Sequence, residues 1–290
     1  LKEMVVHVAV NQSFFPQRHV VLHRPGGQAL LVRALVVLAG VDLNHRALLP
    51  FKLRFVRFLV LGPLSAALLG EFTPRRFCSL LRFRAAKQLS QMHQLRGAEE
   101  QAQTYETIAQ TAATSIQSIF ALENGLLKAS TGKSAQTDVW GSAFAVYCGL
   151  WDEEGNQQIC QSLAQALTQG TIAWKGNIRH VPTDGDYSTE SAWEQVVGQW
   201  PKNHYQNGAY WNTPTGWVCY AVAQVDQQAA RQLAVEYVNQ LREDDFRRGS
   251  EFGAPYECIH PQGDHRQNPV YLTSMTCPLA AFKRLGWLVD

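Results

Sequence analysis

Charged residues are scarce in this 290-residue chain: they make up 17% of it, below the roughly 25% of typical soluble domains. Hydrophobic residues, at 46%, lie in the usual range, which excludes a collagen-like chain and wholesale disorder. No apolar run reaches the ~18 residues needed to cross a bilayer, because Arg33 and Pro63 interrupt the main candidates. The sequence therefore predicts a globular protein with a sizeable core and no transmembrane segment.

Acidic residues are nearly missing from the first third of the chain. Residues 1–97 contain 14 Lys and Arg but only 3 Asp and Glu, and no Tyr or Trp precedes Tyr105. Residues 98–290 contain 12 basic and 21 acidic residues and all 8 Trp. We therefore divide the chain into an uncertain basic, apolar segment over 1–77 and a helical domain over 78–290. We expect the first segment to contribute little to the core.

The basic segment carries one pattern of interest, in which Lys52, Arg54 and Arg57 alternate with apolar residues. Such a strand would suit phosphate or anionic lipid, although an ordinary solvent-exposed strand explains the pattern better. The composition of this segment also resembles a coding sequence read in the wrong frame, so a non-native origin is the alternative. We assign it no function and expect no nucleic-acid partner.

Beyond Glu99, apolar residues recur at helical spacing, and Asp138 and Asp226 stand where helix caps are needed. The pattern predicts helices over about 99–124, 138–150, 153–170, 214–223, 226–242 and 269–285. The connections between them alternate between long and short. In antiparallel hairpins alternate connections lie at the same end, so we expect the three long loops to share one face. That face is the natural place for a site.

The long loops gather carboxylates, amides and aromatic rings. Rings can stack on the apolar faces of a sugar while amides and charged groups bond its hydroxyls, so this mixture suits an oligosaccharide or glycoside. For Asp138 a simple helix cap is the alternative, and Arg179 and His180 suit either hydroxyls or the carboxylate of a uronic-type sugar. The residues predicted to bind substrate are Asp138, Trp174, Arg179, His180, Tyr205, Gln206, Asn207, Tyr210, Trp211, Tyr256 and His260.

Four short segments stand out in these loops: DVWG at 138–141, YQNGAYW at 205–211, TGW at 215–217 and PYEC at 255–258. Together they resemble the six-hairpin glycosidases, over about residues 85–286. The resemblance implies an all-α fold of helical hairpins in an (α/α)6 toroid, acid/base hydrolysis of glycosidic bonds and no organic cofactor. Three hairpins occupy the helical region and six would need about twice that length, so we expect about half of a toroid.

Glycoside hydrolysis uses two carboxyl groups, one protonated and one ionised. Glu257 is the predicted proton donor, because its mostly apolar neighbours would favour the protonated form, and a structural carboxylate bonded to loop amides is the alternative. Asp184 and Asp186 are predicted to act as the base or to bind hydroxyls, with an ordinary turn as the alternative. The acidic and histidine residues around His260 match no tight ligand spacing, so no metal is predicted.

A second function fits the same sequence: a non-catalytic helical module that binds carbohydrate or a protein partner, in an inactive fragment of such an enzyme. The cysteines do not decide between the two. None of the 6 forms a Cys-x-x-Cys pair, and Cys148, Cys160, Cys219 and Cys277 are predicted to be small buried thiols within helices. The sequence assigns the chain to no cellular compartment.

Overall fold

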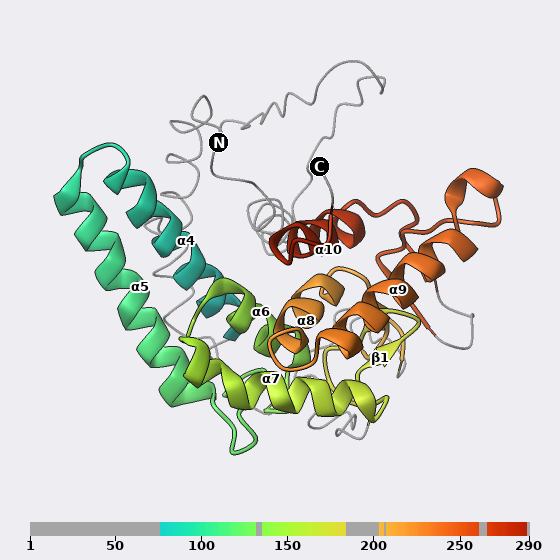
Figure 1. Cartoon of the computed structure of the whole chain (residues 1–290), viewed down its shortest axis with the longest axis horizontal. Helices are drawn as coiled ribbons and strands as arrows, with labels where there is room; N and C mark the ends of the chain where they lie inside the picture. Colours follow the sequence, from blue (N-terminus) through green and yellow to red (C-terminus); the bar gives the residue numbers. More distant parts are fainter. Residues whose placement is uncertain (1–75, 132–134, 184–202, 206, 261–265, 289–290) are drawn as a thin grey trace, which may run out of the picture.

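The computed structural model describes residues 76–131, 135–183, 203–205, 207–260 and 266–288. Seven α-helices dominate these described residues (Figure 1), which confirms the predicted mainly helical class. They are α4 (Arg76–Gln94), α5 (Glu99–Phe120), α6 (Val139–Cys148), α7 (Glu153–Thr168), α8 (Thr215–Val222), α9 (Gln227–Glu243) and α10 (Thr273–Arg284). A short 3-10 helix covers Phe246–Arg248. Among the described helices, none is both long and apolar enough to cross a membrane.

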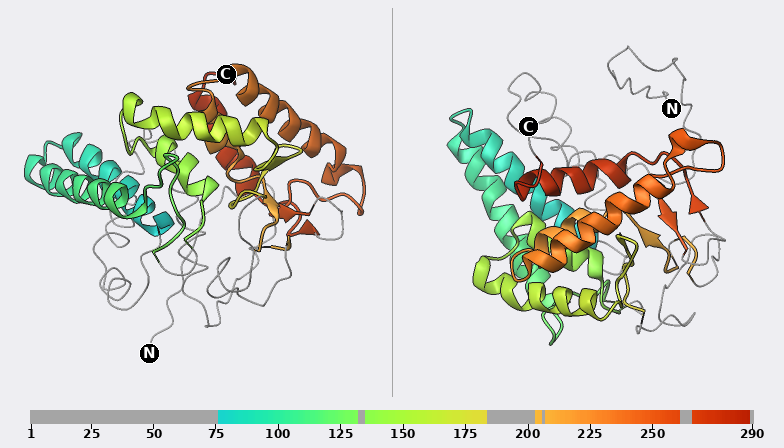
Figure 2. Two further views of the ribbon diagram at one scale, coloured as in Figure 1. Left: turned by 90° about the horizontal axis from the view of Figure 1, so that it is seen from below. Right: turned by 45° about the vertical axis from the view of Figure 1, so that its right-hand side comes forward.

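The helices pair with their neighbours in sequence, as α4 with α5, α6 with α7 and α8 with α9, while α10 packs on α8 (Figures 1 and 2). The sequence did not predict α4. It lies along α5, where Lys87 Nζ is 2.9 Å from Glu106 Oε1 and the rings of His93 and Tyr105 stack at 5.4 Å. The first hairpin therefore begins at Arg76 rather than near residue 98, and most of the basic segment lies outside the described residues.

Three helices begin at an aspartate whose side chain caps them. Asp138, Asp152 and Asp226 each accept a hydrogen bond of 2.9 Å from the main-chain N–H three residues further along the chain. The caps predicted at Asp138 and Asp226 are confirmed. Helix α5 ends at Phe120, four residues before the predicted end, because the following residues turn into a loop.

The core is centred on α6 and α8, two apolar helices that are buried on almost every side. Between them the rings of Phe144 and Trp217 lie 4.6 Å apart. Helices α5, α7 and α9 instead bury one stripe each, as amphipathic outer helices do. Cys148, Cys160, Cys219 and Cys277 are buried free thiols, as predicted, and burial raises the pKa of Cys148 to about 12.

The long loops pair into a small antiparallel sheet that the sequence did not predict. Its strands, in spatial and sequence order, are β1 (Ala173–Trp174), β2 (Asn177–Ile178), β3 (Tyr210–Trp211), β4 (Cys258–Ile259) and β5 (Arg266–Gln267). The remaining long loop joins them at the start of α6, where Trp140 Nε1 donates to the Ile178 carbonyl at 3.2 Å and Val139 N donates to the His180 carbonyl at 2.7 Å. The second and third long loops therefore lie together, and the start of α6, which follows the first long loop, contacts them.

Candidate functional site

The sheet has two faces, and its register decides which predicted residues share one. Ile178 pairs with Trp211, and Trp211 with Cys258. Side chains alternate between faces along a strand, so these three lie on one face, and His180 and His260, two residues further along, follow them. The residues directly before and after them in the sequence lie on the opposite face. We call the first face the Trp211 face and the opposite one the Glu257 face. The members of the Glu257 face are Trp174, Asn177, Arg179, Tyr210, Asn212, Glu257, Ile259, Arg266 and Asn268.

Glu257 lies one residue before β4 and is buried, with 6% of its surface exposed. Its main-chain N–H donates to the Gln267 carbonyl at 2.9 Å, which holds it against β5. The side-chain amide of Asn268 donates a hydrogen bond to Glu257 Oε2. The register, extended by one residue, puts Asn212 opposite Glu257 on β3. Asn212 is 1% exposed, and its Nδ2 has no hydrogen-bond partner.

Arg179 lies on the same face, two strands away from Glu257. It is 5% exposed, and its Nη2 donates to Asn203 Oδ1 at 3.0 Å. Its guanidinium carbon lies 5.4 Å from the ring centroid of Tyr210, and that ring lies 6.2 Å from the half-buried ring of Trp174. A buried carboxyl, a buried guanidinium and two aromatic rings thus share one side of the sheet.

Tyr210 also belongs to a small apolar cluster that packs this part of the sheet against α9. Tyr256 and Ile259 pack with Tyr210 in one apolar cluster, which Leu241 of α9 also contacts. The guanidinium carbon of Arg266 lies 5.6 Å from the ring centroid of Tyr256. Tyr256 is 5% exposed, so it offers little surface for stacking.

The Trp211 face is aromatic. Around Trp211, the rings of Trp140 and Tyr205 lie 5.3 Å and 5.4 Å away. Trp140 is half-buried, packs against the main core and joins α6 to the sheet. Its ring also meets that of His180 at 5.0 Å, edge to face. The rings of His204 and His260 stack at 5.4 Å.

His180 is 5% exposed, and its burial together with the positive charge of Arg179 lowers its pKa to about 3. It is therefore a neutral imidazole near neutral pH. Although Arg179 and His180 are adjacent in sequence, they lie on opposite faces of the sheet. They would therefore meet a substrate from different sides of the sheet, and their predicted role in binding substrate stays a prediction.

Several predicted residues fall outside both faces. The carboxylate of Asp138 caps α6, in agreement with the simpler alternative for that residue. Asn207 closes a tight turn, in which its N–H donates to the His204 carbonyl at 2.8 Å. Asp184, Asp186 and Gln206 lie outside the described residues.

Three asparagines that the sequence did not single out help to build the Glu257 face. Asn268 contacts Glu257, Asn203 contacts Arg179, and Asn212 lies between the two along the sheet. Asn268 and Asn203 adopt positive φ angles of 47° and 72°, a backbone conformation that asparagine tolerates better than most residues. Asn–Pro at 268–269 was a turn signal, but no local pattern pairs it with Glu257.

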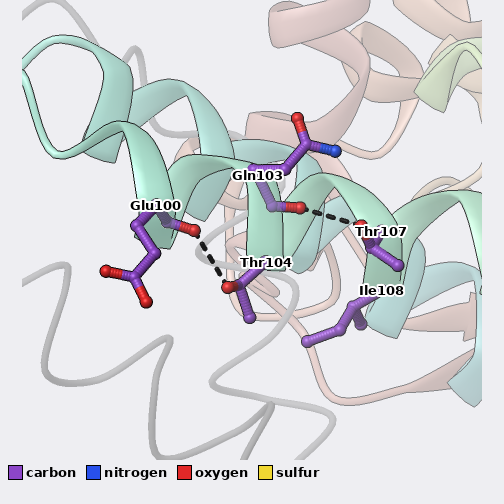
Figure 3. A pocket seen from close by; sticks show the side chains of 5 residues that line it. All are labelled: Glu100, Gln103, Thr104, Thr107 and Ile108. Atoms are coloured by element: carbon purple, nitrogen blue, oxygen red, sulfur yellow. Dashed lines mark hydrogen bonds between the residues drawn. The ribbon is translucent and has the colours of Figure 1, made fainter.

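In the ranges that the structure describes, no group of three or more His, Cys, Asp or Glu residues is arranged to hold a metal ion. A shallow depression of about 550 Å³ lies on α5, remote in sequence from the sheet (Figure 3). The hydroxyls of Thr104 and Thr107 donate to main-chain carbonyls of the same helix, at 2.9 Å and 3.0 Å. Of the lining side chains this leaves only Glu100 and Gln103 with free polar ends, so the depression offers little chemistry.

No family model matches the chain, and no curated protein matches its sequence. Its fold is similar to that of a solved structure titled "Sialidase", with a TM-score of 0.53 and 15% identity over 73% of this chain. A second, titled "Glycosidase Wild Type", aligns over 75% of this chain with 15% identity, but its TM-score of 0.49 is too low to support an argument. The chain spans 20% of the first and 53% of the second. The fold of the described residues is thus similar to part of the structure titled "Sialidase".

Proposed function

We propose that this protein binds a glycoside on the Glu257 face and hydrolyses its glycosidic bond by carboxylate acid/base catalysis. The observation that carries the proposal is the grouping of a buried carboxyl, Glu257, with the aromatic rings of Trp174 and Tyr210 on one side of the sheet. Stacking rings and hydrogen-bond donors recognise a sugar, while a carboxyl group held away from water suits proton transfer to the leaving oxygen.

In this proposal Glu257 donates the proton to the glycosidic oxygen. Asn268 engages one carboxyl oxygen, Oε2, so the side chain is oriented and Oε1 is left for the substrate. Asp184 or Asp186 is the proposed base, which activates water or attacks the anomeric carbon. Both belong to the connection between β2 and β3, whose two ends enter the Glu257 face at Arg179 and Tyr210.

The helical framework supports the same proposal. In the proposal the long connections of the hairpins lie at one end, which is how a toroid of helical hairpins would present a site. We include in the proposal that these hairpins form part of an (α/α)6 toroid, as the sequence resemblance implies. The likeness to the chain titled "Sialidase" points to a carbohydrate as the substrate.

A second candidate function rests on the Trp211 face. Tyr205 and Trp211 form an aromatic cluster with Trp140, and no carboxylate of the described sheet residues lies on that side. The Trp211 indole N–H is buried without a hydrogen-bond partner. A cluster of this kind favours stacking on a sugar without catalysis, so a carbohydrate-binding module is the alternative.

Glu257→Gln tests the proposed catalysis, with Glu251→Gln as the matched control because Glu251 is an exposed glutamate of the same loop. Removing a general acid should reduce the rate on unactivated glycosides by about 10²–10⁴. The loss should shrink with nitrophenyl glycosides, whose leaving groups need little protonation, while substrate binding is largely kept. Glu251→Gln should match the wild type on both substrates.

The companion variant Asp186→Asn should behave in the opposite way if Asp186 is the base. Its loss should persist with an activated leaving group, because the attacking water must still be deprotonated. Full turnover of an unactivated glycoside by Glu257→Gln would show that Glu257 is not the acid. Glycans that bind without turnover, and lose affinity in Trp211→Ala but not in Glu257→Gln, would instead support the binding-module function.

A further inference from the structure

Four polar side chains and one tryptophan form a row across the sheet on the Glu257 face. Trp174 of β1 pairs with Asn177 of β2. The registers of the remaining strands, each extended by one residue, add Asn212, Glu257 and Asn268 in turn. Neighbours in such a row have Cβ atoms about 5 Å apart. The hydrogen bond from Asn268 to Glu257 Oε2 agrees with the last step.

Asn212 is the member of this row that carries an unused donor next to Glu257. It is 1% exposed, and its Nδ2 has no hydrogen-bond partner. Its main chain is fixed, because the N–H of Thr215, at the start of α8, donates to the Asn212 carbonyl at 3.0 Å. A buried donor without an acceptor destabilises the folded state, so its presence points to an acceptor that becomes available in another state of the site.

Two acceptors flank Asn212 in the row. On one side is Asn177, whose Nδ2 donates to the Lys175 carbonyl at 3.0 Å and whose Oδ1 is buried without a partner. On the other side is Glu257. The Asn177 amide is neutral in every state, whereas Glu257 becomes negatively charged when it loses its proton. Hydrogen bonds to a charged acceptor are about twice as strong as neutral ones, so ionised Glu257 is the stronger acceptor of the two.

We propose that Asn212 is a positioning residue that stabilises Glu257 as a carboxylate, by donating from Nδ2 to Oε1 as the catalytic proton leaves that oxygen. The inference rests on the proposed function and concerns how the same site controls its proton. In the proposed reaction the proton passes from Oε1 to the glycosidic oxygen. The bond between that oxygen and the anomeric carbon breaks, its electron pair goes to the oxygen, and the negative charge stays on Glu257.

A buried carboxylate with too few donors would oppose this step. Asn268 already donates to Oε2, and Asn212 supplies the donor for Oε1. The Asn212 donor is held in place before the charge develops, which is the arrangement that lowers the barrier most.

Other ionisable groups near Glu257 are few among the described residues. Those on the same face, next to it in the chain or paired with these are Arg179, Tyr210, Arg266, Cys258 and Asp244. Arg266 Nη1 lies 3.6 Å from Asp244 Oδ1, so these two charges offset each other. Burial raises the pKa of the Cys258 thiol, which keeps it neutral. The variants below change none of these groups, so a change in pH dependence reports on Asn212.

The test measures pH–rate profiles of Asn212→Ala on an alkyl glycoside, whose leaving group is unactivated, and on a nitrophenyl glycoside. On the alkyl glycoside kcat should fall by about 10- to 100-fold with KM unchanged, because one hydrogen bond to a charged group is lost. The loss should be smaller on the nitrophenyl glycoside. The alkaline limb, on which activity disappears as Glu257 ionises, should move to higher pH because the carboxylate has lost a donor.

Asn177→Ala is the matched control, because Asn177 is an equally buried asparagine of the same row, one strand further from Glu257. It should leave the alkaline limb where the wild type has it, whatever it does to stability. Asn212→Asp keeps the shape of Asn212 but replaces the donor by a negative charge, so it should move the limb further in the same direction. This second variant keeps the inference testable if a melting curve shows that Asn212→Ala folds poorly.

The side-chain amide of Asn212 gives a readout that needs no turnover. Its NMR signal, assigned by its loss in Asn212→Ala, should move downfield as Glu257 ionises and stay in place in Glu257→Gln. A signal that ignores Glu257, an unmoved limb, or a limb moved as far by Asn177→Ala would overturn the inference while leaving hydrolysis intact. Failure of the wild type to turn over any glycoside would instead overturn the proposed function.

Discussion

Replacement of Gly176 by alanine tests how closely the sheet approaches α9. Gly176 is the second residue of the two-residue turn between β1 and β2, where Lys175 and Gly176 have φ angles of 46° and 76°, as hairpin turns of this length favour. A Cβ at Gly176 would lie 2.1 Å from the main-chain nitrogen of Tyr237 and 2.2 Å from its Cα. The turn is also tied to α8, because Thr215 Oγ1 donates to the Gly176 carbonyl at 2.6 Å.

The expected cost has two parts. An alanine at positive φ costs about 1–2 kcal/mol, and displacing a helix backbone to admit one methyl group costs about 1–3 kcal/mol more. Gly176→Ala should therefore lower the free energy of unfolding by about 2–5 kcal/mol. Gly170→Ala is the control, since Gly170 has a φ of 70° but no atom within 4 Å of the added Cβ. Gly170→Ala should therefore lower the free energy of unfolding only by the cost of placing alanine at positive φ, about 1–2 kcal/mol.

The assay is urea unfolding of both variants, followed by circular dichroism and tryptophan fluorescence and fitted with a common m value. Alanine lowers the entropy of the unfolded chain equally at both positions, so that effect cancels in the difference. The difference between the variants should be about 1–3 kcal/mol. If the two costs agree within ~0.5 kcal/mol, the close approach of the turn to Tyr237 is refuted.

Two further predictions concern titration and reactivity. Burial and the charge of Arg179 lower the pKa of His180 from 6.5 to about 3. Between these two pH values the unfolded chain binds a proton at this residue that the folded chain does not. The folded state is therefore fully stable above pH 6.5 and loses free energy of unfolding as the pH falls toward 3. His180→Gln should flatten the dependence of unfolding free energy on pH in that window, and an unchanged slope would contradict the pKa shift. A thiol reagent should modify Cys78 alone in the native protein, because Cys78 is exposed and the other five cysteines are buried; fast reaction of a second cysteine before unfolding would show that the core is less closed than described.

The sequence predicted those helices whose ends are marked by a residue that acts within the same few positions of the chain, such as a helix cap. Asp138 and Asp226 stand at helix starts because an aspartate oxygen satisfies a main-chain N–H that the helix itself leaves unpaired, and this choice is visible in the sequence. Helix α4 offered no such signal. Its first turn contains no acidic residue, and it follows directly on the basic, apolar segment whose composition it shares.

The sheet could not be predicted in the same way. Each strand is two residues long, too short for an alternating pattern, and all five pair only across a turn or through tertiary contacts between loop segments. Sequence composition did place the chemistry in these loops, including Glu257 and Arg179. It could not show that Arg179 and His180 face opposite ways, because the face of a side chain depends on register, which distant residues set.

The way the sheet is assembled has a consequence for the order of folding. Each helical hairpin joins helices that are neighbours in sequence. Trp211 and Cys258, by contrast, pair across a stretch of chain that contains α8 and α9. Closing a long loop costs entropy that only later contacts repay, so the hairpins should form early and the sheet late. A partly folded chain would then retain most of its helical signal while Glu257 and Arg179 are still apart. The proposed ligand recognition would then be gained last in folding and lost first under mild denaturation.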